Sequence, residues 1–361
     1  MKLIKSNIII IIISIIISLT TIEFIFIFKN NNLNKNIKKF DPYNRFMLFE
    51  EGDVFKNVES FFKYHSNKNI LSKTFYKDSD KWIEEYSYEI STNNFGLVQK
   101  NDLIKNKKSI LLLGDSFVEG QGSSSWVNNF NGLYKDYQII NGGIIGTGPQ
   151  QFELIENHIS KEFIVKKVIF FYIGDDIRRN IFNISQNTLD CLKDYKTCSG
   201  NENFYGFPFR NNNPIKFLNS LNEYRISQKN DLPFFDKLKV NIKKNLNNLY
   251  IIKIPINVLR QRFYKSKNEY IKRNFNSINN LFLKYENNII FVQLKSKNEV
   301  LYGKEYNSFY TENFIKKISK NHFSCNFNNN INFFNKIDMH PNKDGYNNLY
   351  QCVRKILNNN I

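Results

Sequence analysis

Two segments at opposite ends of the sequence carry residues that can perform chemistry together. The first is an apolar run over 110–113 that leads into Gly114-Asp115-Ser116 and then into an expected helix start. Open α/β sheets bind ligands at the carboxyl ends of their strands, which is where this order of elements puts Ser116. Backbone N–H groups beside such a serine can stabilise a developing oxyanion. A serine in this position is equally a plain helix N-cap, so the segment alone is ambiguous.

The second segment lies just before an expected C-terminal helix and contains Asp338 and His340, followed by Pro341-Asn342. A histidine can accept the proton of a serine hydroxyl, and a nearby carboxylate can hold the imidazole in the required tautomer. The chain has four histidines, and only His340 lies within a patterned segment. A surface or capping histidine is the alternative, so this segment alone is ambiguous as well.

These segments resemble the first and last blocks of the SGNH (GDSL-like) hydrolase superfamily. Gly114-Asp115-Ser116-Phe117 is similar to the first block, and His340-Pro341-Asn342 with Gly345 is similar to the last. Residues 141–148 resemble the second block, and residues 172–176 occupy the place of the third. Asn94-Phe95-Gly96 resembles a lead-in found in envelope members. The likeness covers roughly residues 93–354 apart from an insertion, and the blocks come in the family's order.

The resemblance implies a three-layer α/β/α flavodoxin-like parallel sheet and a covalent acyl-serine intermediate. The nucleophile falls on Ser116, the general base on His340, and Asp338 orients the histidine. The oxyanion donors fall on the backbone N–H groups of Ser116 and Gly146 and on the side chain at position 175. The implied function is a serine-dependent esterase acting on O-acyl esters, acetyl esters among them, with no cofactor and no metal ion. An O-acyltransferase of envelope glycans uses the same triad.

Two positions depart from the family's pattern. The commonest pattern has the aspartate three residues before the histidine, whereas Asp338 is two before His340, as in some envelope members. Position 175 is usually an asparagine, which donates to the oxyanion, whereas an ionised Asp175 only accepts and repels negative charge. Three alternatives follow: burial beside Asp176 keeps Asp175 protonated, or the two backbone donors suffice, or the chain is a non-catalytic glycan-binding pseudoenzyme.

The elements expected to position these residues alternate between strands and helices. Four short apolar segments have the character of buried parallel strands, with helical-length segments between them, and they lie at 110–113, 138–140, 168–173 and 289–294. An aromatic and Asn/Lys-rich stretch at about 180–285 is too long for one crossover, and we interpret it as a helical insertion. We therefore expect an α/β domain at 109–361 that contains this insertion. Residues 41–108 form an N-terminal subregion that the pattern leaves unassigned.

The N-terminus predicts a membrane anchor. Residues 8–28 are apolar apart from Ser, Thr and one Glu, and as a helix they extend roughly 30 Å, the thickness of a bilayer core. No small-residue cleavage site follows, so we expect an uncleaved single-pass anchor at 1–29 and a tether at 30–40. Lysines flank both sides of the span, so charge leaves its orientation open.

The four cysteines favour an oxidising compartment and hence an extracytoplasmic catalytic domain. Cys191 and Cys198 lie in a polar stretch, whereas Cys325 and Cys352 flank the histidine block. Four cysteines allow three pairings, and the pattern does not choose among them. Four free thiols in a domain that faces the cytoplasm are the alternative.

The formal net charge of +18 is ordinarily a sign of nucleic-acid or anionic-surface binding. The chain lacks alanine and is rich in Ile, Asn, Lys, Phe and Tyr, which is the composition that an AT-rich coding sequence imposes. The lysines are scattered, and no zinc-finger spacing or RNA-binding aromatic motif accompanies them. We expect the partners to be a membrane and an O-acylated glycan or lipid, and no nucleic acid. Arg178 and Arg179 are either an anion site for such a substrate or solvated surface residues.

Overall fold

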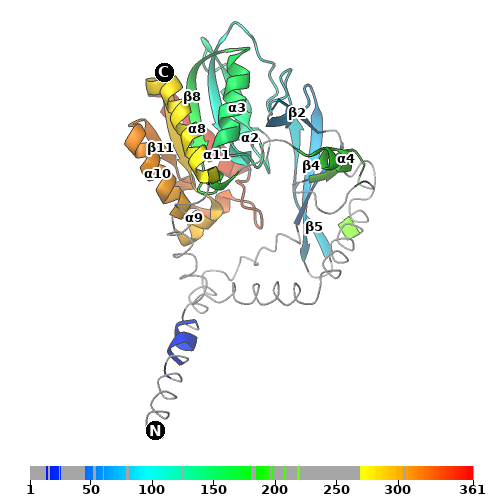
Figure 1. Cartoon of the computed structure of the whole chain (residues 1–361). Helices are drawn as coiled ribbons and strands as arrows, with labels where there is room; N and C mark the ends of the chain where they lie inside the picture. Colours follow the sequence, from blue (N-terminus) through cyan, green and yellow to red (C-terminus); the bar gives the residue numbers. More distant parts are fainter. Residues whose placement is uncertain are drawn as a thin grey trace. The chain divides into compact units, whose positions relative to one another are not determined.

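The apolar strand that ends at Gly114 is an interior strand of a parallel sheet. In the computed structural model of the chain, β6 (Lys108–Gly114) lies between β7 (Tyr137–Gly143) and β8 (Ile164–Tyr172). Beyond β8 come β10 (Ile289–Leu294) and β11 (His322–Cys325), and all neighbours are parallel, in the order β11-β10-β8-β6-β7. Figure 1 labels β8 and β11 of this sheet among the helices that surround it. The structure describes residues 14, 17–23, 25, 45–51, 54–59, 61–78, 81–123, 125–179, 184–194, 197, 206–208, 218–219, 269–303 and 306–360.

Helices cover both faces of this sheet because successive strand residues point to opposite sides. Leu111 and Leu113 pack in one cluster with α3 (Pro149–Ser160), α8 (Glu269–Tyr285) and α10 (Tyr306–Ile318). Ile110 and Leu112 pack on the other face with α11 (Lys343–Asn358) and the 3-10 helix η2 (Trp126–Phe130). The predicted α/β class with a buried parallel sheet is therefore confirmed.

Residues 41–108, which the sequence pattern left unassigned, form an antiparallel sheet and a hairpin. The sheet contains β1 (Arg45–Phe49), β4 (Asn69–Asp78) and β5 (Lys81–Ser91), and the hairpin joins β2 (Phe55–Val58) to β3 (Phe61–Tyr64). Phe55, Phe61 and Tyr64 belong to the same buried cluster as Leu111. Residues 41–221 and 269–361 accordingly form one compact unit.

The predicted helical insertion at about 180–285 contributes a strand as well as helices. Its described parts include α4 (Gln186–Lys193), β9 (Gly206–Pro208) and α8, whereas residues 220–268 lie outside the described residues. β9 pairs in parallel with β1 and extends the sheet to the order β5-β4-β1-β9. Trp82 of β5 donates a 2.8 Å hydrogen bond to Asn219, so this part of the insertion packs on the N-terminal sheet.

Most of the predicted membrane anchor and all of the tether lie outside the described residues. The described positions of this segment, 14, 17–23 and 25, are helical. Hydroxyl groups there donate to carbonyls one turn back, as Ser18 does to Ser14 and Thr21 to Ile17, both at 2.8 Å. Within the part of the chain that the structure describes, no helix has the length and apolar character needed to span a membrane.

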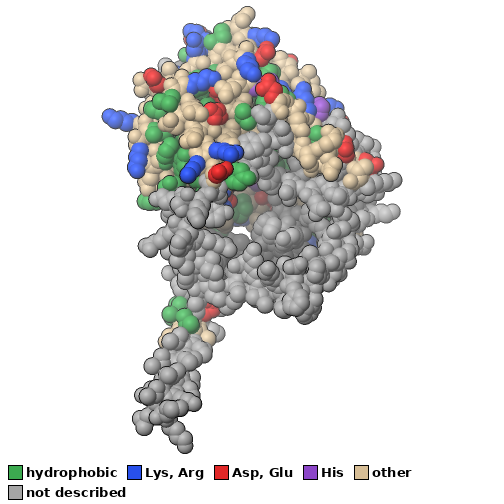
Figure 2. Space-filling view, viewed as in Figure 1, with side chains coloured by type: hydrophobic (Ala, Val, Ile, Leu, Met, Phe, Trp, Pro, Cys, Tyr) green, Lys and Arg blue, Asp and Glu red, His purple; other side chains and the backbone are tan. Residues whose placement is uncertain are grey.

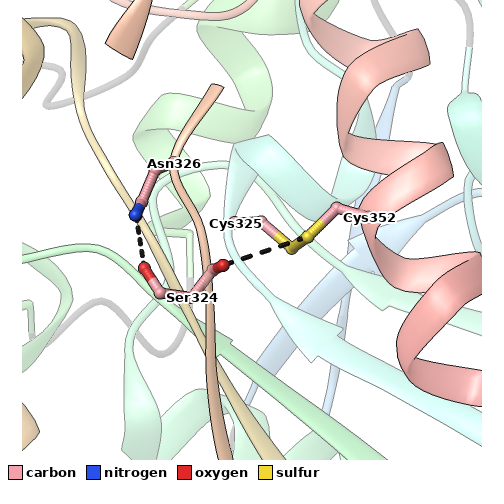
Figure 3. Close-up of a disulfide and its surroundings, with 4 residues drawn as sticks. All are labelled: Ser324, Cys325, Asn326 and Cys352. Atoms are coloured by element: carbon pink, nitrogen blue, oxygen red, sulfur yellow. Dashed lines mark hydrogen bonds between the residues drawn. A yellow bond between two sulfur atoms is a disulfide. The ribbon is translucent and has the colours of Figure 1, made fainter. Parts of the chain in front are cut away.

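A disulfide between Cys325 and Cys352 joins the end of β11 to α11 (Figure 3). Of the three pairings that the sequence allows for its four cysteines, this bond excludes the two that join Cys325 or Cys352 to another partner. Cys198 and the side chain of Cys191 lie outside the described residues. The bond closes a loop of 27 residues that includes Asp338 and His340, and it ties the edge of the sheet to the helix that follows the histidine.

We expect the double variant Cys325→Ser/Cys352→Ser to unfold more easily than the native chain. Opening a 27-residue loop returns conformational entropy to the unfolded chain, which corresponds to about 3–4 kcal/mol of stability. Chemical denaturation followed by circular dichroism measures the difference. A Ser324→Ala/Ser319→Ala variant, with the disulfide intact, serves as the control. Equal midpoints for the native and double-variant chains would contradict a stabilising role for the bond.

Candidate active site

The turn after β6 presents Ser116 at the carboxyl end of the sheet. Asp115 caps the short helix α2 (Ser116–Glu119) by accepting a 3.0 Å hydrogen bond from the Phe117 N–H. This cap fixes Ser116 as the first residue of the helix, beside N–H groups that have no partner within the helix. Ser116 is 3% exposed, so its hydroxyl is held in a largely desolvated position.

The loop that carries His340 is folded back on itself just before α11. An isolated bridge joins Phe334 to Pro341, and Asn342 caps α11 by accepting from the N–H groups of Asp344 and Gly345. A Cβ atom on Gly345 would lie 2.1 Å from the Phe333 carbonyl oxygen, so only glycine permits this return of the chain. The residues of the motif His-Pro-Asn-x-x-Gly therefore have structural roles. Pro341 closes a hairpin-like loop, Asn342 caps the helix that follows, and Gly345 lets the chain pass close to Phe333.

Ser116, His340 and Asp338 form a continuous hydrogen-bonded relay. The Nε2 atom of His340 lies 2.8 Å from Ser116 Oγ, and its Nδ1 atom lies 3.0 Å from Asp338 Oδ2. The carboxylate can only accept, so Nδ1 carries the proton and Nε2 is free to accept from the serine. Ser116 Oγ also lies 3.3 Å from Asp115 Oδ2, but this distance is long for an O–H···O bond, and the histidine is the stronger partner.

The structure brings together the three residues predicted for the relay, although 224 residues separate Ser116 from His340. Asp338 is 2% exposed, and its other oxygen accepts a 2.7 Å hydrogen bond from the Met339 N–H. Buried carboxylates remain charged only when donors surround them. The relay therefore has the arrangement that general-base activation of a serine requires.

The predicted backbone oxyanion donors lie in two buried turns. Gly146 has a φ of +74°, in the left-handed region that glycine favours, and its loop follows β7 directly. Among the described residues, neither the Ser116 N–H nor the Gly146 N–H donates to a group of the protein. Donors without an internal partner are what an oxyanion hole needs, because they remain available to the charge that develops during the reaction.

The side chain predicted as third oxyanion donor is placed differently. Asp175 is about half exposed and forms an ion pair with Arg178. The buried carboxyl is that of Asp176, whose Oδ2 accepts a 2.9 Å hydrogen bond from the Ile173 N–H. Burial, followed by the charge of Asp115, raises the pKa of Asp176 well above its usual range. One alternative held that burial keeps Asp175 protonated. The residue that is buried with a raised pKa is instead its neighbour, Asp176.

Arg179 neutralises part of this acidic surrounding. Its guanidinium lies 2.8 Å from Asp115 and 3.2 Å from Asp176, and it donates a 3.2 Å hydrogen bond to the Thr147 carbonyl. Arg179 therefore links the serine turn, the Gly146 loop and the turn after β8. Arg178, by contrast, is an exposed residue that pairs with the half-exposed Asp175, so only Arg179 reaches the buried aspartates.

Glu119 anchors the loop that contains the predicted donor Gly146, although no sequence motif marks it. Its carboxyl group accepts from the Ile145 N–H at 2.7 Å and from the Tyr64 hydroxyl at 3.0 Å. Burial raises the pKa of Glu119 to about 8, against the opposing effect of these two hydrogen bonds. At neutral pH the group is mostly uncharged, so it fixes the peptide next to Gly146 without adding negative charge beside the oxyanion hole.

Two further contacts of the site come from residues without a recognisable sequence signal. Tyr86 of β5 donates a hydrogen bond to Asp338 Oδ2, the oxygen that His340 also contacts. Tyr346 of α11 donates a 2.8 Å hydrogen bond to the Gln121 carbonyl and so ties α11 to the end of the serine turn. Tyr346 lies five residues after Pro341, on the buried stripe of a helix, which gives a weak periodic signal.

No protein-family model matches the chain, and no curated protein matches it. Among the residues that the structure describes, no group of His, Cys, Asp or Glu side chains is arranged to hold a metal ion. The chemistry argued from this site therefore rests on the geometry of the serine, the histidine and their neighbours.

We expect the stability of the protein to fall as pH rises from about 4.5 to about 8 because of Glu119. In this window the unfolded chain loses the Glu119 proton while the folded chain retains it, so the folded state is disfavoured by up to about 1.4 kcal/mol per pH unit. Glu119→Gln removes this contribution, and its free energy of unfolding is expected to decline less steeply than that of the native chain. Urea denaturation at several pH values measures both slopes, with Glu89→Gln, on an exposed residue of β5, as control. Parallel slopes would contradict the raised pKa.

Proposed function

We propose that the chain is a membrane-anchored, SGNH-like serine enzyme that cleaves O-acyl esters through an acyl-serine intermediate. The observation that carries this proposal is the relay itself, with 2.8 Å between Ser116 Oγ and His340 Nε2 and 3.0 Å between His340 Nδ1 and Asp338 Oδ2. The serine hydroxyl faces the histidine nitrogen that would accept its proton, and the other histidine nitrogen faces the carboxylate that would orient it. A serine that served only as a helix cap would not need a histidine and a buried aspartate aligned behind it.

The proposed reaction starts with attack of Ser116 Oγ on the ester carbonyl carbon while His340 Nε2 takes the hydroxyl proton. The negative charge on the former carbonyl oxygen is stabilised by the N–H groups of Ser116 and Gly146. The C–O bond to the leaving alcohol then breaks, and His340 returns the proton to that alcohol. Asp338 stays ionised throughout and stabilises the transient imidazolium.

The acyl group leaves Ser116 when a second oxygen nucleophile attacks it, with His340 again acting as base. If this nucleophile is water, the enzyme is an esterase, and if it is a hydroxyl of a glycan, the enzyme is an O-acyltransferase. Both outcomes use the same residues, and they differ in which acceptor reaches the acyl-serine and how well water is excluded. Esterase activity on O-acyl esters is our first choice, with envelope-glycan acyl transfer as the alternative.

A non-catalytic glycan-binding role is the rival from a different functional class, and Asp175 favours it. Its carboxylate pairs with Arg178, so it offers an acceptor where the family has a donor. Against this rival stands the intact relay, together with two backbone donors that have no partner among the described residues. We propose that these two donors suffice.

The proposed location is the outer side of a membrane. The Cys325–Cys352 disulfide supports an oxidising compartment for the α/β domain. Figure 2 shows lysines and arginines spread among acidic side chains on the visible face rather than gathered in one stripe. This distribution favours a glycan or lipid ester as partner over nucleic acid.

Replacing Ser116 by alanine is expected to lower ester turnover by at least about 10³-fold, because no other group can form the covalent intermediate. The measurement is acetate release from a generic acetyl ester by the full-length chain in detergent, with detection of an acetylated Ser116 peptide by mass spectrometry. Ser160→Ala, at the exposed end of α3, is the matched control. Turnover that survives in Ser116→Ala would exclude the acyl-serine route.

Replacing Asp175 by asparagine is expected to raise kcat for the same ester, by up to about 10²-fold, because an amide donates to the oxyanion where the carboxylate repels it. Asp136→Asn changes the net charge equally at an exposed position and is the control. An unchanged rate in Asp175→Asn would show that position 175 takes no part in the oxyanion site. A lower rate would show that the ion pair with Arg178 is required.

A further inference from the structure

A β-bulge in the N-terminal sheet faces the proposed relay. Thr74 of β4 pairs with Tyr86 of β5, whereas the next residue, Phe75, pairs with Glu84, so Glu85 has no residue opposite it. Successive side chains of a regular strand point to opposite faces, and an extra residue at a bulge changes this direction. Two consecutive side chains, Glu85 and Tyr86, can therefore contact the same loop.

Both side chains do reach the loop that carries Asp338 and His340. Glu85 Oε1 accepts hydrogen bonds from the N–H groups of Ile337 at 2.6 Å and Asp338 at 2.9 Å. The Tyr86 hydroxyl donates to Asp338 Oδ2. The bulge thus holds the backbone of the aspartate and its carboxylate at the same time.

A lysine holds this loop from another element. Lys297, in α9 (Lys297–Tyr302), is largely buried and donates hydrogen bonds to the carbonyls of Asn335 at 2.6 Å and Lys336 at 2.7 Å. The Lys297 ammonium and the Glu85 carboxylate therefore bind the same short segment, residues 335–338. The ammonium binds its carbonyl groups and the carboxylate binds its N–H groups. The aspartate is therefore positioned from two sides, and the only side chain among these that touches its carboxylate besides His340 is Tyr86.

We propose that Tyr86 is a positioning residue of the relay, so that the working unit is Tyr86-Asp338-His340-Ser116. This inference rests on the proposed function for its catalytic meaning. The Tyr86 hydroxyl and His340 Nδ1 share one oxygen, Asp338 Oδ2, so Tyr86 fixes the rotation of the carboxylate toward the imidazole. It also takes up part of the negative charge, which limits how strongly Asp338 stabilises the imidazolium.

The charged and titratable groups around the His340–Asp338 pair come from five elements. Beyond Ser116 lie Asp115 and Arg179, from the serine turn and the turn after β8, and behind the loop lie Glu85 and Tyr86 of β5 and Lys297 of α9. The buried hydroxyl groups of Tyr88 on β5 and Tyr346 on α11 are also close enough to Asp338 to interact with its charge. Substitution of Tyr86 by phenylalanine leaves all the other groups in place. A change in the pKa of His340 in that variant therefore reports on the hydroxyl alone.

The first test measures the pKa of His340 by NMR in the full-length chain in detergent, labelled at its four histidines and assigned with His340→Gln. In Tyr86→Phe we expect this pKa to rise by about 0.5 to 1 unit, since Asp338 then directs more of its charge at the imidazolium. Replacing Tyr86 by 3-fluorotyrosine gives a stronger donor of almost the same size, and we expect a fall of about 0.3 unit. Tyr76→Phe, on the neighbouring strand β4, should leave the pKa unchanged.

The second test measures ester turnover in the same variants. We expect Tyr86→Phe to lower kcat about tenfold with KM within about twofold, and the acid limb of the kcat/KM profile to move to higher pH together with the His340 pKa. A His340 pKa that is the same in Tyr86→Phe, the fluorotyrosine protein and the native chain would overturn the inference even if Ser116-dependent turnover stands. Opposite pKa shifts in a chain without any turnover would support the positioning role and overturn the proposed function instead.

Discussion

The site depends on one constraint, which is that the carboxyl ends of parallel strands meet at a single edge of a sheet. The turns after β6, β7 and β8 contain Ser116, Gly146 and Asp176, and the hydrogen-bonded order of these strands brings the turns together. Each single polar contact of the relay contributes only about 1 kcal/mol net. The apolar clusters on the two faces of the sheet must therefore supply the rigidity that a 2.8 Å serine–histidine contact needs.

The acidic groups that surround Ser116 are accommodated in three different ways. Asp338 is surrounded by donors and can remain charged, whereas Glu119 is buried with a raised pKa and is mostly neutral near pH 7. Asp115 and Asp176 share the guanidinium of Arg179. Without these arrangements several carboxylates in one buried region would repel one another and any oxyanion formed there. The charge that faces His340 Nδ1 is then the Asp338 carboxylate, which a proton-accepting histidine requires.

Local sequence patterns were informative wherever a residue's role depends on its neighbours along the chain. The run 289–294 is buried throughout and coincides with β10, and the Gly-Asp-Ser turn and the capped histidine loop are short-range structures. β11 was missed because its four residues are partly exposed and too few to show a period. The role of Tyr86 could not be predicted, since it contacts an aspartate 252 residues away through a bulge that no local pattern indicates. Asp175 and Asp176 are identical in type, and only their placement separates an exposed ion pair from a buried acid.

The pairing of β9 with β1 has a consequence for how the chain avoids intermolecular strand pairing. β9 contributes three residues from the insertion, and they cover the backbone donors and acceptors of β1 on the side away from β4. An uncovered strand edge is a template for pairing with another chain, and β1 is apolar after its first residue, Arg45, which favours such pairing. Shortening the insertion to remove β9 would therefore expose the unpaired edge of β1. This edge belongs to the sheet whose strand β5 contacts Asp338, so intermolecular β-sheet formation would compete with the native fold.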